Sequence, residues 1–160
     1  LNLAHLAAHK IVDYALANSC DVIVFEYLDT KGKKKGSKKQ KLSMWKHQDI
    51  QNTVERLAHS LGIRVAHVCA WNTSKLAYDG SGAVLRGKKI SEATPYDICR
   101  FQSGKTYNCD LSASYNIGAR YIIKELIKVL PNIMTEVSNI GGGTSRTLST
   151  LWNINSVMLI

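Results

Sequence analysis

The stretch Asp21-Val-Ile-Val-Phe-Glu26 decides the fold class of this chain. Its uninterrupted apolar, largely β-branched run is typical of a strand that is buried on both faces, at the centre of an α/β sheet. Apolar residues recur at helical spacing before it, over residues 3–18, and after it, from Ile50 to Leu61. Gly62 ends that second helix, and Ile63–Val68 then predicts a second strand.

The C-terminal half begins irregularly and ends in helices. Residues 69–105 predict an irregular or small β insertion, because turn-forming residues interrupt them: Gly80, Gly82, Gly87, Pro95 and Gly104. A long helix is expected from about Leu111 to Leu130, where Pro131 stops it, and a short final helix over 144–158. This order of elements indicates an α/β fold. Two confident strands are too few for a stable sheet, so the insertion supplies more strands or strands are missing upstream.

Composition limits the class of protein. The 160 residues suit one globular domain, since 45% are apolar and 21% are charged. Apolar runs such as Val22–Phe25 are far too short to cross a membrane, and we see no secretory signal. The chain does not begin with Met, and Leu1 lies where a helix is expected to start. We therefore expect a fragment of a longer protein that acts without a membrane.

The metal-ligating residue types are scattered. Four cysteines occur without any C-x-x-C pair, so free, reduced thiols are expected rather than a disulfide scaffold or a zinc site: Cys20, Cys69, Cys99 and Cys109. His5 and His9 are one helical turn apart, but no further ligand accompanies them, which favours an ordinary helix surface.

Positive charge is concentrated in one segment. The formal net charge is +9, and seven of the 21 basic residues fall within eleven positions: Lys31, Lys33, Lys34, Lys35, Lys38, Lys39 and Lys41. Two glycines, a serine and no apolar residue predict a loop. This loop is either a solvated charge run or an arm that contacts nucleic-acid phosphates, and we favour the arm. Trp45 is the best candidate for stacking on a base, although packing remains the simpler role, and Trp71 and Trp152 are expected to pack.

Two carboxylates are candidates for a site. Glu26 ends the apolar strand, where ligands bind in open α/β sheets, although it is equally a residue at which the strand reaches solvent. Asp110 precedes the long helix, where capping the helix N-terminus is the simpler role. Carboxylate oxygens suit Mg²⁺, and a two-metal phosphodiesterase site needs several of them. These two acids are therefore suggestive but incomplete.

Three segments of the chain form a recognisable set: Val24-Phe-Glu-Tyr-Leu28, Trp71-Asn-Thr-Ser74 and Tyr107-Asn-Cys-Asp-Leu-Ser-Ala-Ser-Tyr-Asn-Ile-Gly-Ala-Arg-Tyr121. In this order they resemble the transposon-encoded TnpB (OrfB) family of RNA-guided DNA endonucleases, which is related to the type V CRISPR effectors. The resemblance covers residues 1 to about 130, and its most specific part runs from Asp110 to Ile117. It implies the C-terminal part of a RuvC-like nuclease within the RNase H-like fold, over residues 1–130, followed by a tail over 131–160.

The resemblance also implies a chemistry. Glu26 and Asp110 correspond to the second and third catalytic acids, which would hold two Mg²⁺ ions, whereas the first Asp has no counterpart here. The chain alone is therefore expected to be inactive. Its implied partners are DNA, a guide RNA and the missing N-terminal part of the nuclease, in the cytoplasm of a prokaryote, at the nucleoid.

The insertion, about residues 69–109, departs from the family. Family members often carry a zinc ribbon there, but Ala77 and Gly80 stand where the first cysteine pair would fall, and no zinc is expected. The insertion is expected to keep a target-strand-binding role through its basic residues: Lys75, Arg86, Lys88, Lys89, Arg100 and Lys105. Two alternatives to the nuclease stay open, namely a nucleic-acid-binding module without cleavage and a transposon remnant.

Overall fold

The computed structural model describes residues 3–27, 38–69, 71–130 and 145–158. The chain divides into two compact units, Leu1–Val68 and Cys69–Ile160, and we describe each by itself. The architecture is mixed α/β, with small sheets, as the sequence predicts at the level of class. In the described residues, no helix is both long enough and apolar enough to cross a bilayer.

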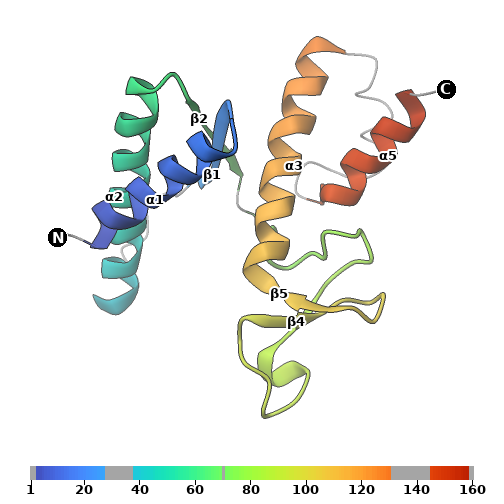
Figure 1. Cartoon of the computed structure of the whole chain (residues 1–160). Helices are drawn as coiled ribbons and strands as arrows, with labels where there is room; N and C mark the ends of the chain where they lie inside the picture. The colour runs from blue at the N-terminus through green and yellow to red at the C-terminus, as the bar shows by residue number, and fades with distance from the viewer. Residues whose placement is uncertain (1–2, 28–37, 70, 131–144, 159–160) are drawn as a thin grey trace. The chain divides into compact units, whose positions relative to one another are not determined.

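The first unit packs two helices against a two-stranded sheet (Figure 1). Its elements are α1 (Leu3–Ala17), β1 (Val22–Tyr27), α2 (Lys38–Ser60) and β2 (Arg64–Cys69). Small residues let α1 cross α2 closely, since Ala8 and Ala58 are both fully buried in the same core as Val54. Both strands and both helices thus match the predicted order of elements.

β1 differs from the predicted strand in its burial. All of Val22–Glu26 are half-buried, whereas the apolar run predicted a strand buried on both faces. Alternate side chains of a strand point to opposite faces, and Ile23 and Phe25 are the ones that pack against the helical core. The expectation of full burial on both faces is therefore wrong for this unit, in which β2 is the one strand that pairs with β1 among the described residues.

α2 begins twelve residues earlier than the apolar spacing predicts, at Lys38 rather than Ile50. The residues of this extra part include Lys, Gln, Leu and Met, which are good helix formers, and neither Gly nor Pro. The prediction followed apolar periodicity alone, and this polar start has none. The predicted loop over Lys31–Lys41 is thus wrong at its end, since residues 38–41 are helical, and residues 31–37 lie outside the described residues.

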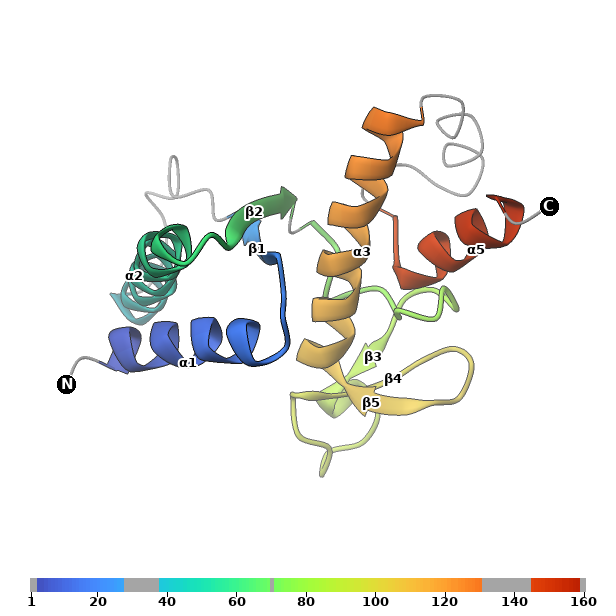
Figure 2. The same ribbon diagram turned by 45° about the horizontal axis from the view of Figure 1, so that its top comes forward.

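The second unit contains the predicted small β insertion (Figure 2). Three short strands form an antiparallel sheet in the order β3 (Leu85–Arg86), β4 (Ile98–Arg100) and β5 (Thr106–Asn108). Within this sheet Leu85 lies opposite Arg100, and Cys99 lies opposite Tyr107. A 3-10 turn, η1 (Gly87–Lys89), follows β3 directly. The core beneath the sheet contains Ala77, Cys99, Phe101 and Cys109.

Helix α3 (Cys109–Val129) follows β5 without a loop, and α5 (Leu148–Met158) packs against it. Ile123 of α3 is fully buried and contacts Ile154 of α5 in a second core of this unit. The short final helix is thus confirmed. The predicted division into residues 1–130 and 131–160 stays a prediction, to which the structure adds that α5 shares a core with α3.

Two buried polar side chains, one turn apart on α3, bind the surrounding chain. Asn116 is fully buried, and its amide donates to the carbonyls of Thr73 (3.0 Å) and Leu76 (2.9 Å). Its side-chain oxygen accepts from the N–H of Leu148, at the start of α5 (3.2 Å). Arg120, which is 6% exposed, donates to three further carbonyls: those of Cys69, Trp71 and Arg146.

We expect Asn116→Ala to destabilise the chain by about 3 kcal/mol, because it leaves two carbonyls and one N–H without their buried partner. Urea unfolding followed by circular dichroism measures the change. Ser114→Ala is the matched control on the same helix, since Ser114 is exposed and bonds only within its own turn, to Leu111 (2.8 Å). Equal stability of the two variants would contradict the anchoring role of Asn116.

Candidate nucleic-acid interface

A basic cleft opens on the insertion of the second unit. Its volume is about 610 Å³, and four of its eight lining residues are cationic, whereas none is acidic: Ser74, Lys75, Ala83, Val84, Arg86, Lys88, Lys89 and Tyr96. Three stretches of the chain form it, namely residues 74–75, residues 83–89 and Tyr96. The bond from the N–H of Val84 to the carbonyl of Lys75 (3.0 Å) holds the first two together. A cleft that concentrates one sign of charge attracts a polyanion.

Arg86 is the least exposed of the four cations of the cleft, since its side chain is 21% exposed and the three lysines are exposed residues. Its guanidinium carbon lies 4.6 Å from the centre of the Tyr96 ring, which is a cation–π contact. One terminal nitrogen lies 4.0 Å from a carboxylate oxygen of Asp110. The Nε atom is buried without a hydrogen-bond partner, one of four such side-chain atoms in the part of the chain that the structure describes. Arg86 therefore has one buried donor that makes no hydrogen bond.

Asp110 lies in the first turn of α3, and its side chain is 84% exposed. The side chain of Asn108 caps the helix instead, accepting from the N–H groups of Asp110 (2.9 Å) and Leu111 (3.1 Å). The expectation that Asp110 serves as the cap is therefore wrong, because α3 begins two residues earlier than predicted. The Asp110 carboxylate is thus exposed to solvent, with Arg86 near it.

Glu26 lies near the end of β1, in the first unit, whereas Asp110 belongs to the second. Its backbone carbonyl accepts from the side-chain amide of Gln51 (3.1 Å), and its side chain is half-buried. Among the described residues, no group of three or more His, Cys, Asp or Glu side chains is arranged to hold a metal. The two predicted catalytic acids therefore stay predictions.

The predicted basic residues fall into three groups. Lys75 and Arg86 share the cleft with Lys88 and Lys89, although Lys88 also pairs with Glu92 (3.2 Å). Arg100 and Lys105 do not line it. The lysines of the basic segment form the third group. At the start of α2 lie Lys38, Lys39 and Lys41, and outside the described residues lie Lys31, Lys33, Lys34 and Lys35.

Lys105 contacts aromatic rings of its own unit. Its ammonium lies 5.0 Å from the ring centre of Tyr78 and 4.8 Å from that of Tyr107, and it donates to the Tyr78 hydroxyl. The hydroxyl of Tyr115, 3.5 Å away, raises the pKa of Tyr107 to about 12. The ammonium of Lys105 therefore already has aromatic partners, Tyr78 and Tyr107, within its own unit.

The tryptophans differ from the packing that the sequence predicts. Trp71 is 64% exposed and Trp152 is 51% exposed, so neither is a core residue, although Trp152 contacts the edge of Tyr78. Trp45 is 61% exposed and lines a small hollow with Leu3 and Ile50, in the first unit. Tyr96 was not predicted to be a functional residue, and its one sequence signal is that it is an aromatic residue near the Lys88-Lys89 pair.

The two buried cysteines of the insertion come together through the sheet. Their sequence spacing gives no pairing, but antiparallel β4 and β5 place Cys109 near Cys99. Burial and the neighbouring Cys109 thiol raise the pKa of Cys99 to about 12. All four cysteines are free thiols, as the sequence predicts, and a neutral buried thiol such as Cys99 is unreactive.

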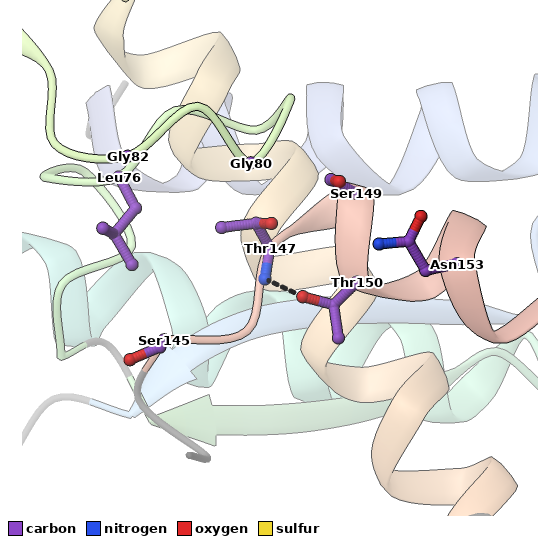
Figure 3. Close-up of a pocket in the computed structure, with 8 residues that line it drawn as sticks. All are labelled: Leu76, Gly80, Gly82, Ser145, Thr147, Ser149, Thr150 and Asn153. Atoms are coloured by element: carbon purple, nitrogen blue, oxygen red, sulfur yellow. Dashed lines mark hydrogen bonds between the residues drawn. The ribbon is translucent and has the colours of Figure 1, made fainter. Parts of the chain in front are cut away.

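A second hollow of this unit, of about 280 Å³, is polar but uncharged (Figure 3). Hydroxyl groups from the start of α5 face the loop that contains Gly80 and Gly82, and Thr150 Oγ1 accepts from the N–H of Thr147 (3.0 Å). A side chain at Gly80 would meet the Ser149 hydroxyl at 2.7 Å. The loop therefore packs closely against the start of α5 at the edge of this hollow.

The basic cleft and the exposed Asp110 belong to a fold that a solved structure shares. The chain resembles Cas12f1, as seen in the cryo-EM structure of the Cas12f1–sgRNA–target DNA complex, with a TM-score of 0.53 and 22% sequence identity. The similarity covers 72% of this chain and 32% of the Cas12f1 chain, so this chain spans about a third of that length. No family model matches the sequence, and no curated protein does. The comparison therefore establishes a shared fold.

Proposed function

We propose that this chain is the C-terminal part of a RuvC-like nuclease domain, with the RNase H-like fold, in an RNA-guided DNA endonuclease related to TnpB. The observation that carries the proposal is the exposed carboxylate of Asp110 at the first turn of α3, beside Arg86 of the basic cleft. Metal-assisted phosphodiester hydrolysis requires carboxylates close to the bound phosphate, and Asp110 would supply one of them beside the basic cleft. Similarity to a fold seen with sgRNA and target DNA supports the same assignment.

Asp110 and Glu26 are the proposed metal ligands, and their oxygens suit Mg²⁺. Bound Mg²⁺ would activate a water molecule and stabilise the leaving oxygen of the phosphodiester. The described residues do not form a complete site, because they include no group of three potential ligands. The proposal therefore assigns the third carboxylate to an N-terminal part of the nuclease, and it assigns no reaction step to this chain alone.

The cleft residues have a role that needs no metal. Lys75, Arg86 and Lys89 would hold backbone phosphates of DNA or of a guide RNA. The lysines of residues 31–41 stay predicted phosphate contacts. Phosphate contacts fix the register of a strand and carry no sequence information, so the choice of target would rest with the guide. The location of the protein in the cytoplasm, at the nucleoid, stays a prediction.

The second candidate function is a nucleic-acid-binding module without cleavage. The absence of a three-ligand group among the described residues favours it. Both candidates bind nucleic acid through the same cleft, so cleavage is the property that separates them.

The nuclease proposal predicts Mg²⁺-dependent cleavage of single-stranded DNA by the longest reading frame that contains this sequence. We expect Asp110→Asn to lower the cleavage rate at least about 100-fold, because an amide is a poor Mg²⁺ ligand. The substitution leaves the helix cap intact, since Asn108 provides it. A gel assay with end-labelled DNA, with and without Mg²⁺, measures the rate.

Asp97→Asn is the matched control for that experiment, because Asp97 is an exposed carboxylate of the same unit that does not line the cleft. We expect this variant to cleave at the unsubstituted rate. Cleavage that survives Asp110→Asn would refute the role of Asp110. A folded protein that binds DNA and never cleaves it would favour the binding module.

The cleft also predicts a specific salt dependence of binding. A cation that neutralises one phosphate of a single strand contributes about 0.7 to the slope of log affinity against log salt. We expect Lys89→Gln to reduce the slope by about that amount, whereas Lys124→Gln, an exposed lysine of α3 outside the cleft, leaves it unchanged. Fluorescence anisotropy of a labelled oligonucleotide, between roughly 50 and 300 mM salt, gives both slopes. Equal slopes for the two variants would exclude the cleft as the phosphate site.

A further inference from the structure

Two exposed aromatic rings accompany the basic cleft. Tyr96, which lines it, is 74% exposed, and Trp71, just before its Ser74–Lys75 wall, is 64% exposed. Each ring contacts a cation of the cleft: the Arg86 guanidinium lies 4.6 Å from the centre of Tyr96, and the Lys75 ammonium 5.8 Å from the centre of Trp71. Two cations of the cleft thus each contact an exposed aromatic ring, and cations combined with exposed rings are typical of single-strand binding sites.

The local backbone fixes the Tyr96 ring while it stays exposed. Gly87 has a φ of +51°, and a Cβ there would lie 3.2 Å from both Cα and Cδ2 of Tyr96. Position 87 therefore requires glycine for two reasons, its left-handed backbone and its close approach to Tyr96. With Gly87 beside it and Arg86 against its face, the ring has little freedom to lose on binding. An aromatic ring that is held in place but exposed is suited to contact a ligand rather than a core.

We propose that this surface binds single-stranded nucleic acid, with bases stacked on Tyr96 and Trp71 and phosphates bound by Lys75, Arg86 and Lys89. The proposal deepens the proposed function by adding base contacts to the phosphate contacts of the cleft. Only unpaired bases offer a free face to an aromatic ring, so the surface distinguishes a single strand from a duplex. Every base has such a face, so binding tolerates any sequence.

Arg86 connects the two kinds of contact. Its guanidinium supports the Tyr96 ring from one side, while its Nε is a buried donor without a partner. Because the side chain is 21% exposed, its terminal guanidinium nitrogens would donate to a phosphate oxygen at the cleft. Lys88 contributes less than the other cations, because Glu92 already pairs with it at 3.2 Å.

The test is a binding measurement in EDTA, so that its result does not depend on cleavage. The 160-residue chain is titrated into labelled 12-mers of four kinds: oligo-dT, oligo-rU, an abasic strand with the same phosphates, and a duplex. We expect oligo-dT to bind at least about 10-fold more tightly than the abasic strand, because base stacking adds to the phosphate contacts. Comparison of oligo-dT with oligo-rU shows whether DNA or RNA is the preferred strand.

Tyr96→Ala is the decisive variant. We expect it to weaken oligo-dT binding about 5- to 100-fold and to leave abasic binding and the salt slope unchanged, because it removes a ring and no charge. Tyr96→Phe keeps the ring and is expected to bind normally. Tyr14→Ala, a 70% exposed tyrosine of α1, is the matched control and is expected to have no effect. Trp71→Ala repeats the test if Tyr96→Ala fails to fold by circular dichroism.

Three results would overturn the proposal: equal affinity for oligo-dT and the abasic strand, a Tyr96→Ala variant that weakens both alike, or duplex binding as tight as oligo-dT binding. Competition by polyglutamate as effective as that of oligo-dT would show a surface for acidic proteins and would also overturn it. Selective stacking in a protein that never cleaves DNA would support this inference while refuting the nuclease, so the two failures are distinguishable.

Discussion

The second unit depends on two buried polar side chains of one helix, Asn116 and Arg120 of α3. Together they bind carbonyls from residues 69–76 and the chain at residues 146–148, segments with too few apolar side chains to be held by packing alone. A buried carbonyl without a partner costs about as much as a lost hydrogen bond, so these irregular segments are stable only while α3 supplies the donors. α3 thus replaces the hydrogen bonds that a longer sheet would otherwise provide.

The geometry of the candidate interface follows from this arrangement. The segment held by Asn116 and Arg120 carries Trp71 and Lys75, which form one side of the cleft. The first turn of the same helix carries Asp110, beside Arg86 of the opposite side. A single rigid helix therefore positions the exposed carboxylate, one wall of the cleft and one of its aromatic rings. Functional groups placed on a rigid element keep their spacing better than groups placed on loops alone.

The helices and the longer strands could be predicted from the pattern of apolar residues along the sequence, whereas the candidate interface could not. Apolar patterns identified α1, β1, β2 and α3, because each of them packs apolar side chains into a core. They failed at the polar start of α2, and they could not resolve strands of two or three residues such as β3. The basic residues of the insertion were identified singly, but the division between Lys75 and Arg86 inside the cleft and Arg100 and Lys105 outside it arises from long-range pairing. The exposure of Trp71 and Tyr96 has no signature in one sequence.

The places where this unit departs from efficient packing coincide. A large exposed ring at Tyr96 and a buried unpaired nitrogen on Arg86 are each unfavourable for stability, and both residues line the same cleft. Folded proteins tolerate such local conflicts mainly where a ligand compensates for them. A base stacked on the Tyr96 ring would cover its exposed face. This coincidence, rather than the number of positive charges, is the strongest reason to regard the cleft as a binding site.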